Sequence, residues 1–343
     1  MKLGKRPRED TADREVVLAA VEHRGDELEY ASEELKNDRE VVLTAVKNSY
    51  GCRALQYASD ELKNDREFVL AAVEHRGAAL EYASEELKND REVVLTAVKN
   101  GALALEYASY ELKNDREVVL TAVSEQEEEE YYPYGNALQY ASEELKNDRE
   151  LVLATIENCG FALEFVSDEL KNDREIVLTA VAHCGRALQY ASDELKNDHE
   201  VVLAAVKNDG GAVQHLDTDE IAHGVTLQFA SDELKNDKEI VFAAVEECGI
   251  SLRYASEELK KDLEIVSAAV CQWDNCGYAF SCASDEVKND REFVLKVVGL
   301  NGDALQHASH ELLQDCEFLL RAVARNGYAL DAALKAVRGR RLE

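Results

Sequence analysis

Residues 90–114, DREVVLTAVKNGALALEYASYELKN, carry the pattern that decides the fold of this chain. In the first half, apolar residues recur at offsets that fall on one face of an α-helix, and Gly101 follows them as a stop signal. A second apolar pattern after that glycine again has helical spacing. The first pattern consists of Val93, Val94, Ala97 and Val98, and the second of Ala104, Leu105, Ala108 and Leu112. The stretch therefore predicts two short helices, here called helix A and helix B.

The boundaries of these helices give two further expectations. Asn114 is expected to cap the next helix A, with Glu117 three residues later completing a capping box. The end of helix B stays open between two possibilities. Ala108 and Ser109 either continue the same helix or cap a separate single turn.

The same unit recurs along the whole chain with a basic period of 25 residues. Asp-Arg-Glu, or a degenerate copy of it, opens twelve units, and the intervals between their aspartates are 25, 27, 25, 25, 33, 25, 25, 39, 25, 28 and 25 residues. Residues 13–48 match residues 65–100 at 33 of 36 positions. The twelve aspartates are Asp13, Asp38, Asp65, Asp90, Asp115, Asp148, Asp173, Asp198, Asp237, Asp262, Asp290 and Asp315.

A tandem period of this length is typical of solenoids, with either helices or strands in each unit. The Val-Val-Leu core has strand propensity, but the leucine-rich-repeat pattern does not recur, and the flanking Ala, Glu and Lys favour helix. Helices of about ten residues are marginal alone, so they must stack on their neighbours. The sequence predicts an all-α fold, an α-solenoid of about twelve 25-residue helix-turn-helix repeats.

Composition and charge exclude several classes of protein. The 343 residues include 46% hydrophobic residues, which is too many for a disordered chain, and their net charge of −31 opposes strong binding to nucleic acid. No run of about 18 uncharged apolar residues occurs, and residues 1–10 lack the apolar core of a signal peptide. We therefore expect neither membrane insertion nor secretion, and a cytoplasmic monomer. The basic residues Lys5, Arg6 and Arg8 leave nuclear import as an alternative.

The chain divides by this pattern into three parts. Residues 1–12 form a basic tail, residues 13–320 the repeats, and residues 321–343 a capping segment that loses the tyrosine register and ends in arginines. All extra residues fall between helix A and helix B. The resulting insertion loops are expected near 49–52, 124–135, 208–224 and 271–277.

Insertions confined to one edge of a solenoid mark either a binding surface or sequence drift in tolerant loops. The loop 124–135, SEQEEEEYYPYG, combines carboxylates with aromatic rings, which suits a basic, arginine-bearing peptide. The alternative is a solvated loop extended by charge repulsion. The candidate binding residues are Glu127, Glu128, Glu129, Glu130, Tyr131, Tyr132 and Tyr134.

The 14-residue excess after residue 207 has a different interpretation. Residues 210–221 and 222–234 both resemble helix B, so a repeat that lost its helix A would explain them. This deletion should bend or fault the stack between residues 205 and 235.

Residues that could carry chemistry occur mostly in repeated positions. One aromatic residue per repeat, from Tyr30 to Tyr254, is expected to pack between repeats. The cysteines are expected to be reduced, and the spacing of Cys271, Cys276 and Cys282 fits no zinc pattern. We therefore expect no catalytic, cofactor-binding or metal-binding residue.

The recurring string YASEELKNDREVVLTAVKNGxAL resembles the unit of domain-of-unknown-function family 4116. Members of that family often have proline after the serine, which this chain lacks. The resemblance implies a tandem helical array and transfers no catalytic residue.

Three functions remain as hypotheses. The first is a non-enzymatic interaction scaffold or adaptor, whose acidic surface binds a protein or basic peptide. The second is an enzyme with its site in the irregular residues 205–282, which include His215, His223, Cys271 and Trp273. The third is weak binding of divalent cations by exposed carboxylates.

Overall fold

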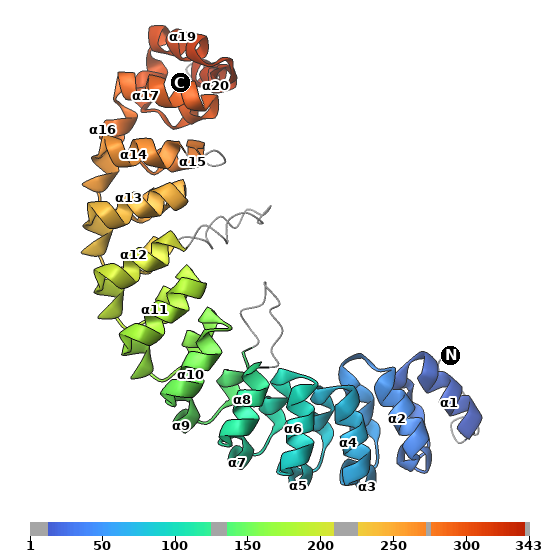
Figure 1. The fold of residues 1–343 in the computed structure, drawn as a ribbon. Helices are drawn as coiled ribbons and strands as arrows, with labels where there is room; N and C mark the ends of the chain where they lie inside the picture. The colour runs from blue at the N-terminus through green and yellow to red at the C-terminus, as the bar shows by residue number, and fades with distance from the viewer. Residues whose placement is uncertain (1–12, 125–135, 209–225, 272–275, 340–343) are drawn as a thin grey trace. The chain divides into compact units, whose positions relative to one another are not determined.

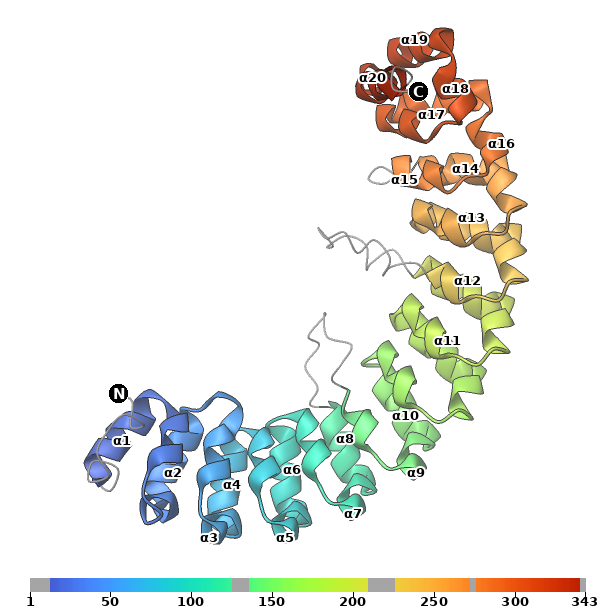
Figure 2. The ribbon, with the colours of Figure 1, turned by 180° about the vertical axis from the view of Figure 1, so that it is seen from behind.

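The computed structural model describes residues 13–124, 136–208, 226–271 and 276–339. These residues form helices and turns with no β-strand among them, which confirms the all-α repeat fold. The chain divides into two compact units, Met1–Leu170 (unit 1) and Lys171–Glu343 (unit 2). Within each unit, successive α-helices lie side by side (Figures 1 and 2).

Each repeat begins with one α-helix of eight to ten residues, as expected for helix A. Unit 1 contains α1 (Arg14–His23), α2 (Arg39–Lys47), α4 (Arg66–His75), α6 (Arg91–Lys99), α8 (Arg116–Ser124) and α10 (Arg149–Ile156). Unit 2 contains α11 (Arg174–His183), α12 (His199–Lys207), α13 (Lys238–Glu247), α14 (Leu263–Val270), α17 (Arg291–Leu300) and α19 (Cys316–Arg325).

The residue that caps each helix A is the aspartate, which corrects the expectation for Asn114. The carboxylate of Asp115 accepts hydrogen bonds from the backbone N–H groups of Glu117 and Val118 at 3.0 and 3.1 Å. The short aspartate side chain reaches the second and third N–H groups of the helix, so Glu117 lies one position too early for a capping box. The same capping occurs at all twelve aspartates.

Helix B is not one α-helix but a 3-10 helix followed by a separate short turn, which decides the open question at Ala-Ser. The 3-10 helices are η2 (Gly25–Tyr30), η4 (Tyr50–Tyr57), η5 (Gly77–Tyr82), η6 (Ala102–Tyr107), η7 (Ala137–Tyr140), η8 (Gly160–Phe165), η10 (Gly185–Tyr190), η13 (Thr226–Phe229), η15 (Gly249–Tyr254), η17 (Gly302–His307) and η18 (Gly327–Ala329). In one repeat α15 (Cys276–Ser281) takes this place.

The turns that follow are single α-helical or 3-10 turns begun by the recurring serine. They are η3 (Leu35–Asn37), α3 (Asp60–Lys63), α5 (Glu85–Lys88), α7 (Tyr110–Lys113), α9 (Glu143–Lys146), η9 (Leu170–Asn172), η11 (Leu195–Asn197), η14 (Leu234–Asn236), η16 (Leu259–Lys261), α16 (Asp285–Lys288) and α18 (His310–Gln314). Ser109 accepts a hydrogen bond from the N–H of Leu112 at 3.3 Å and so caps the turn. The chain ends in α20 (Leu330–Gly339).

The core of each unit lies between the α-helices and the 3-10 helices. In α6 and η6, the side chains of Val93, Val94, Val98 and Leu105 are 0% exposed. Full burial of one such side chain stabilises the fold by about 1.5–3 kcal/mol. Because elements this short do not persist alone, the packing between neighbouring repeats stabilises each of them.

A polar ladder along the turns fixes the register between repeats. The N–H of Ser109 donates to the carbonyl of Lys88 in the preceding repeat at 2.9 Å, and the hydroxyl of Ser109 donates to Oδ1 of Asn89. Nδ2 of Asn89 in turn donates to Glu111 at 3.0 Å. The backbone bond recurs at ten serines in the two units, between 2.9 and 3.1 Å. The recurring Ser and Asn therefore hold neighbouring repeats together.

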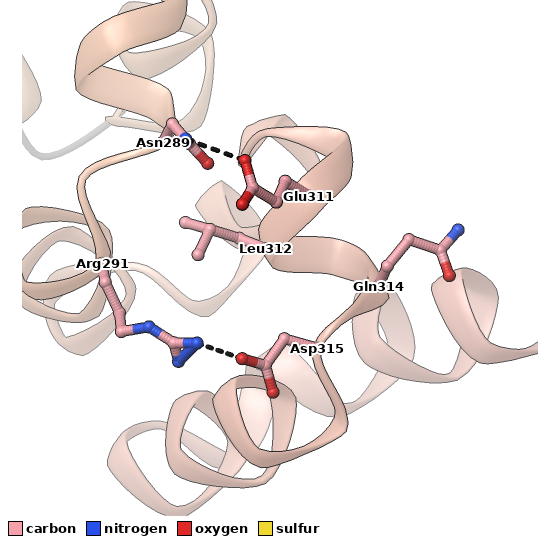
Figure 3. Close-up of a pocket in the computed structure, with 6 residues that line it drawn as sticks. All are labelled: Asn289, Arg291, Glu311, Leu312, Gln314 and Asp315. Carbon is pink, nitrogen blue, oxygen red and sulfur yellow. Dashed lines mark hydrogen bonds and ion pairs between the residues drawn. The ribbon is translucent and has the colours of Figure 1, made fainter.

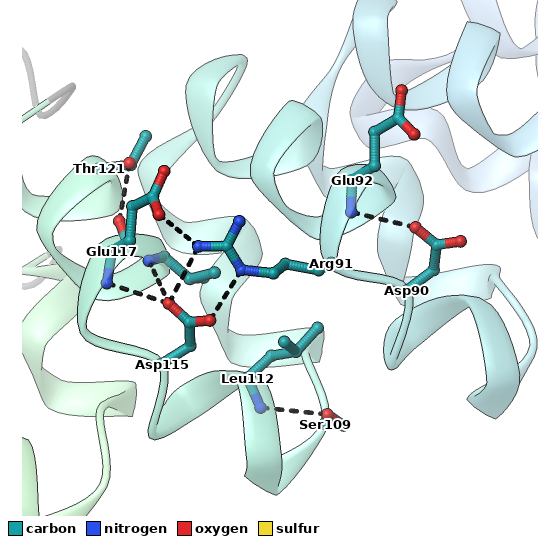
Figure 4. Close-up of polar contacts among 9 residues, drawn as sticks. Asp90, Arg91, Glu92, Ser109, Leu112, Asp115, Glu117 and Thr121 are labelled. Atoms are coloured by element: carbon teal, nitrogen blue, oxygen red, sulfur yellow. Dashed lines mark hydrogen bonds and ion pairs between the residues drawn. The ribbon is translucent and has the colours of Figure 1, made fainter.

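A second ladder joins the starts of successive α-helices through charge. Nε of Arg91 lies 2.8 Å from Asp115, and Nη2 of the same side chain lies 2.5 Å from Glu117 (Figure 4). Equivalent rungs start from Arg14, Arg39, Arg66, Arg116, Arg174, Lys238 and Arg291. Each exposed pair contributes less than about 1 kcal/mol. Because the pair recurs along both units, these small stabilising contributions add up over the stack.

We expect acid to weaken the stack through this ladder. Hydrogen bonds from the preceding Arg or Lys hold the pKa of Asp38, Asp90, Asp115, Asp198 and Asp262 below its ordinary value of 3.8. These carboxylates therefore stabilise the fold above pH 3.8, and this stabilisation is lost as the pH falls through their pKa in the folded protein. Urea unfolding midpoints should fall between pH 5 and about pH 2. Arg91→Met should reduce that fall; an unchanged pH dependence would contradict the role of the rung.

The insertions differ from expectation at two places. The two extra residues near 49–52 lengthen η4, because a 3-10 helix continues through them. The stack does not fault between residues 205 and 235: α12 packs on α13, and Ser231 donates its N–H to the Lys196 carbonyl at 3.0 Å. The expected fault is therefore wrong for α12 and α13, while the loss of a helix A stays a prediction because residues 209–225 lie outside the described residues. The polar ladder keeps the same pairing of serine with lysine although 14 residues are added between helix A and helix B of this repeat.

The C-terminal boundary also moves. Arg321 lies inside α19, which starts at the ordinary cap Asp315, so the twelfth helix A extends to Arg325. The segment that differs from other repeats is η18 and α20. It packs on η17 and α18 and leaves apolar residues exposed, among them Leu330 at 49% and Leu334 at 43%.

Candidate functional site

One face of unit 1 carries a column of tyrosines and carboxylates, here called the tyrosine–carboxylate column. In unit 1, each 3-10 helix that follows a helix A ends on an aromatic residue, while the leucine two positions earlier is buried, as Leu80 and Leu105 are at 0% exposure. Successive 3-10 helices of unit 1 pack on one another, which brings their last residues into line. The column consists of Tyr30, Tyr57, Tyr82, Tyr107 and Tyr140 with Glu29, Glu81 and Glu106.

The carboxylates of the column lie beside tyrosine hydroxyls of the following repeat. Burial, and then the neighbouring carboxylates Glu81 and Glu106, raise the pKa of Tyr107 and Tyr140. Burial and the adjacent Glu81 raise the pKa of Tyr82 to about 12. The phenols therefore stay protonated at neutral pH beside the carboxylates.

The column is accessible to a partner. Tyr30 is 46% exposed, the other four tyrosines are half-buried, and Glu29 and Glu106 are exposed. A ring face next to a carboxylate offers a guanidinium both a cation–π contact and a charge-assisted hydrogen bond. The cation–π contact alone occurs between adjacent residues of unit 2, where the guanidinium carbon of Arg253 lies 5.9 Å from the ring centre of Tyr254.

The expected packing role of these tyrosines describes only half of their environment. Glutamate precedes the tyrosine at Glu29, Glu81 and Glu106, and glutamine precedes it at the other two tyrosines of the column. In unit 2, glutamine or arginine precedes Tyr190, Phe229 and Tyr254. This difference is visible in the sequence, but a packing stripe predicted from the tyrosines alone does not include their neighbours on the solvent side.

The residues singled out in the acidic insertion are not placed. Glu127, Glu128, Glu129, Glu130, Tyr131, Tyr132 and Tyr134 lie outside the described residues, as do His215, His223 and Trp273. Of the other candidates, Cys271 is exposed and Cys282 is half-buried, with its Sγ 3.4 Å from the Tyr278 carbonyl oxygen. Within the described part of the chain, no three His, Cys, Asp or Glu side chains gather as metal ligands.

An open hollow of about 310 Å³ lies between the last two repeats of unit 2. It is lined by Asn289, Arg291, Glu311, Leu312, Gln314 and Asp315 (Figure 3). Its polar groups already serve the two ladders, because Nδ2 of Asn289 donates to Glu311 at 3.2 Å and Arg291 pairs with Asp315. We therefore assign the hollow to the repeat interface.

Comparison with known proteins agrees with the repeated architecture. None of the curated proteins compared with the chain matches it. Across the described ranges, no helix has the length and apolarity required to cross a bilayer. The pattern of one family matches ten overlapping tandem segments, residues 13–63, 48–88, 65–110, 90–126, 134–171, 173–221, 222–260, 237–288, 262–312 and 290–337. The chain therefore belongs to the family described as Domain of unknown function (DUF4116).

Proposed function

We propose that this protein is a non-enzymatic interaction scaffold that binds an extended, arginine-bearing protein segment along the tyrosine–carboxylate column of unit 1. The observation that carries the proposal is the repeated placement of a half-buried phenol beside a carboxylate, at Glu29 and Tyr57, Glu81 and Tyr107, and Glu106 and Tyr140. The net charge of −31 favours encounter with a cationic partner.

The spacing of the column sets the spacing of the partner's cations. Neighbouring packed helices lie about 8–10 Å apart, and an extended peptide advances about 3.3 Å per residue. A segment with arginine at every third position can therefore place one guanidinium on each repeat. Lysine should bind more weakly, because an ammonium group cannot make the planar, forked contact to a carboxylate.

A labelled peptide (Arg-Gly-Ser)5 tests this by fluorescence anisotropy with the full chain. The double variant Glu81→Gln and Glu106→Gln should bind about tenfold more weakly, since each charge-assisted hydrogen bond contributes about 1.5–3 kcal/mol before solvent screening. The matched control is Glu22→Gln with Glu74→Gln, which changes net charge equally on exposed residues outside the column. It should keep most of the affinity.

A second peptide separates site recognition from charge attraction. A peptide of the same composition with its five arginines consecutive should bind more weakly than (Arg-Gly-Ser)5. Equal binding of both peptides, together with equal losses in the two double variants, would overturn the proposal. Neither of the other hypotheses, an enzyme in residues 205–282 or a divalent-cation binder, gains support from the described residues.

A further inference from the structure

A glycine at the start of the 3-10 helix leaves space for the backbone of the next repeat. This space beside the glycine is here called the glycine cradle. A Cβ atom built on Gly25, Gly77, Gly185 or Gly249 would lie only 1.9–2.2 Å from a backbone carbonyl oxygen in the following helix A. Those oxygens belong to Ala45, Ala97, Ala205 and Ala269. Only glycine lets the end of the next helix approach this closely.

The last repeat keeps this glycine although nothing fills the cradle. A Cβ on Gly327 would meet no atom within 4 Å, whereas one on Gly302 in the preceding repeat would lie 2.5 Å from the backbone of Ala329. The glycine thus recurs at Gly327, and among the described residues the space beside it is open.

Two apolar residues of the last repeat are more exposed than their equivalents in the earlier repeats. Leu320 in α19 is 73% exposed, while Leu295 at the same position of α17 is 7% exposed. Leu330 is 49% exposed, and Leu305 one repeat earlier is 0% exposed. The Leu320 position faces a following repeat, because Ser267, its equivalent in α14, accepts a hydrogen bond from Lys296 of the next helix A at 3.2 Å.

The first repeat presents the opposite side of the same interface. Val16 in α1 is only half-buried, whereas its equivalents Val41, Phe68 and Val93 are at most 2% exposed. Ala19 of α1 is exposed and occupies the position that faces a preceding repeat, as Lys296 does. Among the described residues, the last repeat thus exposes the surface that contacts a following repeat elsewhere, and the first repeat exposes the surface that contacts a preceding one.

The local charges of the two surfaces are opposite. Residues 13–28, which leave out the column, carry five carboxylates and two arginines, whereas residues 316–339 carry four basic and two acidic side chains. At physiological salt, exposed charges more than about 8 Å apart are largely screened. The attraction between the two adjoining surfaces is therefore stronger than the screened repulsion between two whole chains of net charge −31.

We propose that the C-terminal repeat of one molecule binds the first repeat of a second copy, with the end of α1 at Ala20 entering the cradle at Gly327. This contact continues the repeat interface between two molecules, uses surfaces separate from the tyrosine–carboxylate column, and goes beyond the proposed function. Such a head-to-tail contact leaves one free surface of each kind, so the assemblies grow with concentration.

The contact between two molecules is weaker than a junction within one chain, and is therefore reversible, because it lacks the hydrogen bonds and ion pairs of the two ladders. Cys316 replaces the arginine of the charge ladder, and Gln314 replaces the asparagine of the Ser–Asn ladder. Nε2 of Gln314 lies 3.3 Å from Nε2 of His310 in its own turn. Apolar contact and the glycine cradle hold the junction.

Sedimentation velocity of the full chain, from low micromolar to several hundred micromolar, tests the proposal. The weight-average sedimentation coefficient should rise with concentration in the unaltered protein. Gly327→Leu fills the open cradle and should abolish that rise while leaving the thermal midpoint unchanged, since its side chain meets open space. Leu320→Glu and Ala19→Glu should abolish it as well. The control Leu103→Glu, at a residue 42% exposed within unit 1, should not.

Mixing the two end variants tests the polarity of the contact. Ala19→Glu keeps an intact C-terminal surface and Leu320→Glu keeps an intact first repeat, so an equimolar mixture should form complexes that stop at two molecules. A chain that stays monomeric at every concentration, as the sequence suggested, would overturn the proposal. Association that survives Gly327→Leu, or end variants that fail to combine, would overturn it equally.

Discussion

Gly77→Ala should lower the free energy of unfolding by about 3 kcal/mol, one of the two largest effects we expect from a single substitution. Its Cβ would lie 2.1 Å from the carbonyl oxygen of Ala97 and 3.0 Å from the backbone of Gly101. Backbone atoms cannot move aside as a flexible side chain can, so η5 and α6 must separate. The separation also strains the hydrogen bond from the N–H of Gly77 to the carbonyl of Asn100, 3.4 Å long in the folded protein.

Gly101→Ala is the matched control for this prediction. A Cβ on Gly101 would lie 3.7 Å from the nearest atom, which is ordinary contact, and its φ of 168° is extended backbone open to any residue. Alanine there should change stability by less than about 1 kcal/mol, and in the stabilising direction. Urea unfolding of both variants measures the difference. Equal stabilities would show that the glycine cradle does not govern the spacing of repeats.

Leu105→Ala should destabilise unit 1 by about 2–5 kcal/mol, because it leaves a cavity between η6 and the α-helices around it. Leu103 lies in the same 3-10 helix and has the same side chain, but it is 42% exposed where Leu105 is 0% exposed. Leu103→Ala should therefore cost less than about 1 kcal/mol. In Leu105→Ala, hydrogen exchange should accelerate most in α6, η6 and the repeats directly on either side, since each repeat contacts mainly its neighbours. Acceleration spread evenly over residues 13–339 would contradict this.

The sequence predicted the period, the helix A positions and the all-α stack, because these follow from apolar spacing and from the regular aspartates. It did not predict which polar residue caps a helix and which one bonds to the next repeat. Asn114 and Asp115 are adjacent and both are good caps, so propensity alone could not separate them. In the fold Asp115 caps α8, whereas the side chain of Asn114 is hydrogen-bonded to Ser142 and Glu144 of the next repeat. Only the contact between repeats distinguishes the two.

The break in helix B depends on the same kind of contact. The string around Ala108 and Ser109 is compatible with a continuous helix. Ser109 breaks it because its N–H and hydroxyl bond to Lys88 and Asn89 of the preceding repeat. Those partners are 20 and 21 residues away, beyond the reach of a local pattern. For the candidate site, the alternation of Glu and Tyr was present in the sequence, but the alignment of successive 3-10 helices that makes it a column required the structure.

The ladder of Lys, Asn and Ser makes most junctions between repeats chemically interchangeable. Crossing over between two copies of the gene segment for Leu-Lys-Asn-Asp would add or remove whole units in frame, and the new neighbours would find the same partners. Residues 13–48 and 65–100, which differ at three positions, carry the mark of such an event. The opposite edge, where 8 and 14 residues were added beside intact Ser142 and Ser231 rungs, is correspondingly free to accept grafted segments without a change of register. An array of this kind can change its length and its insertions independently.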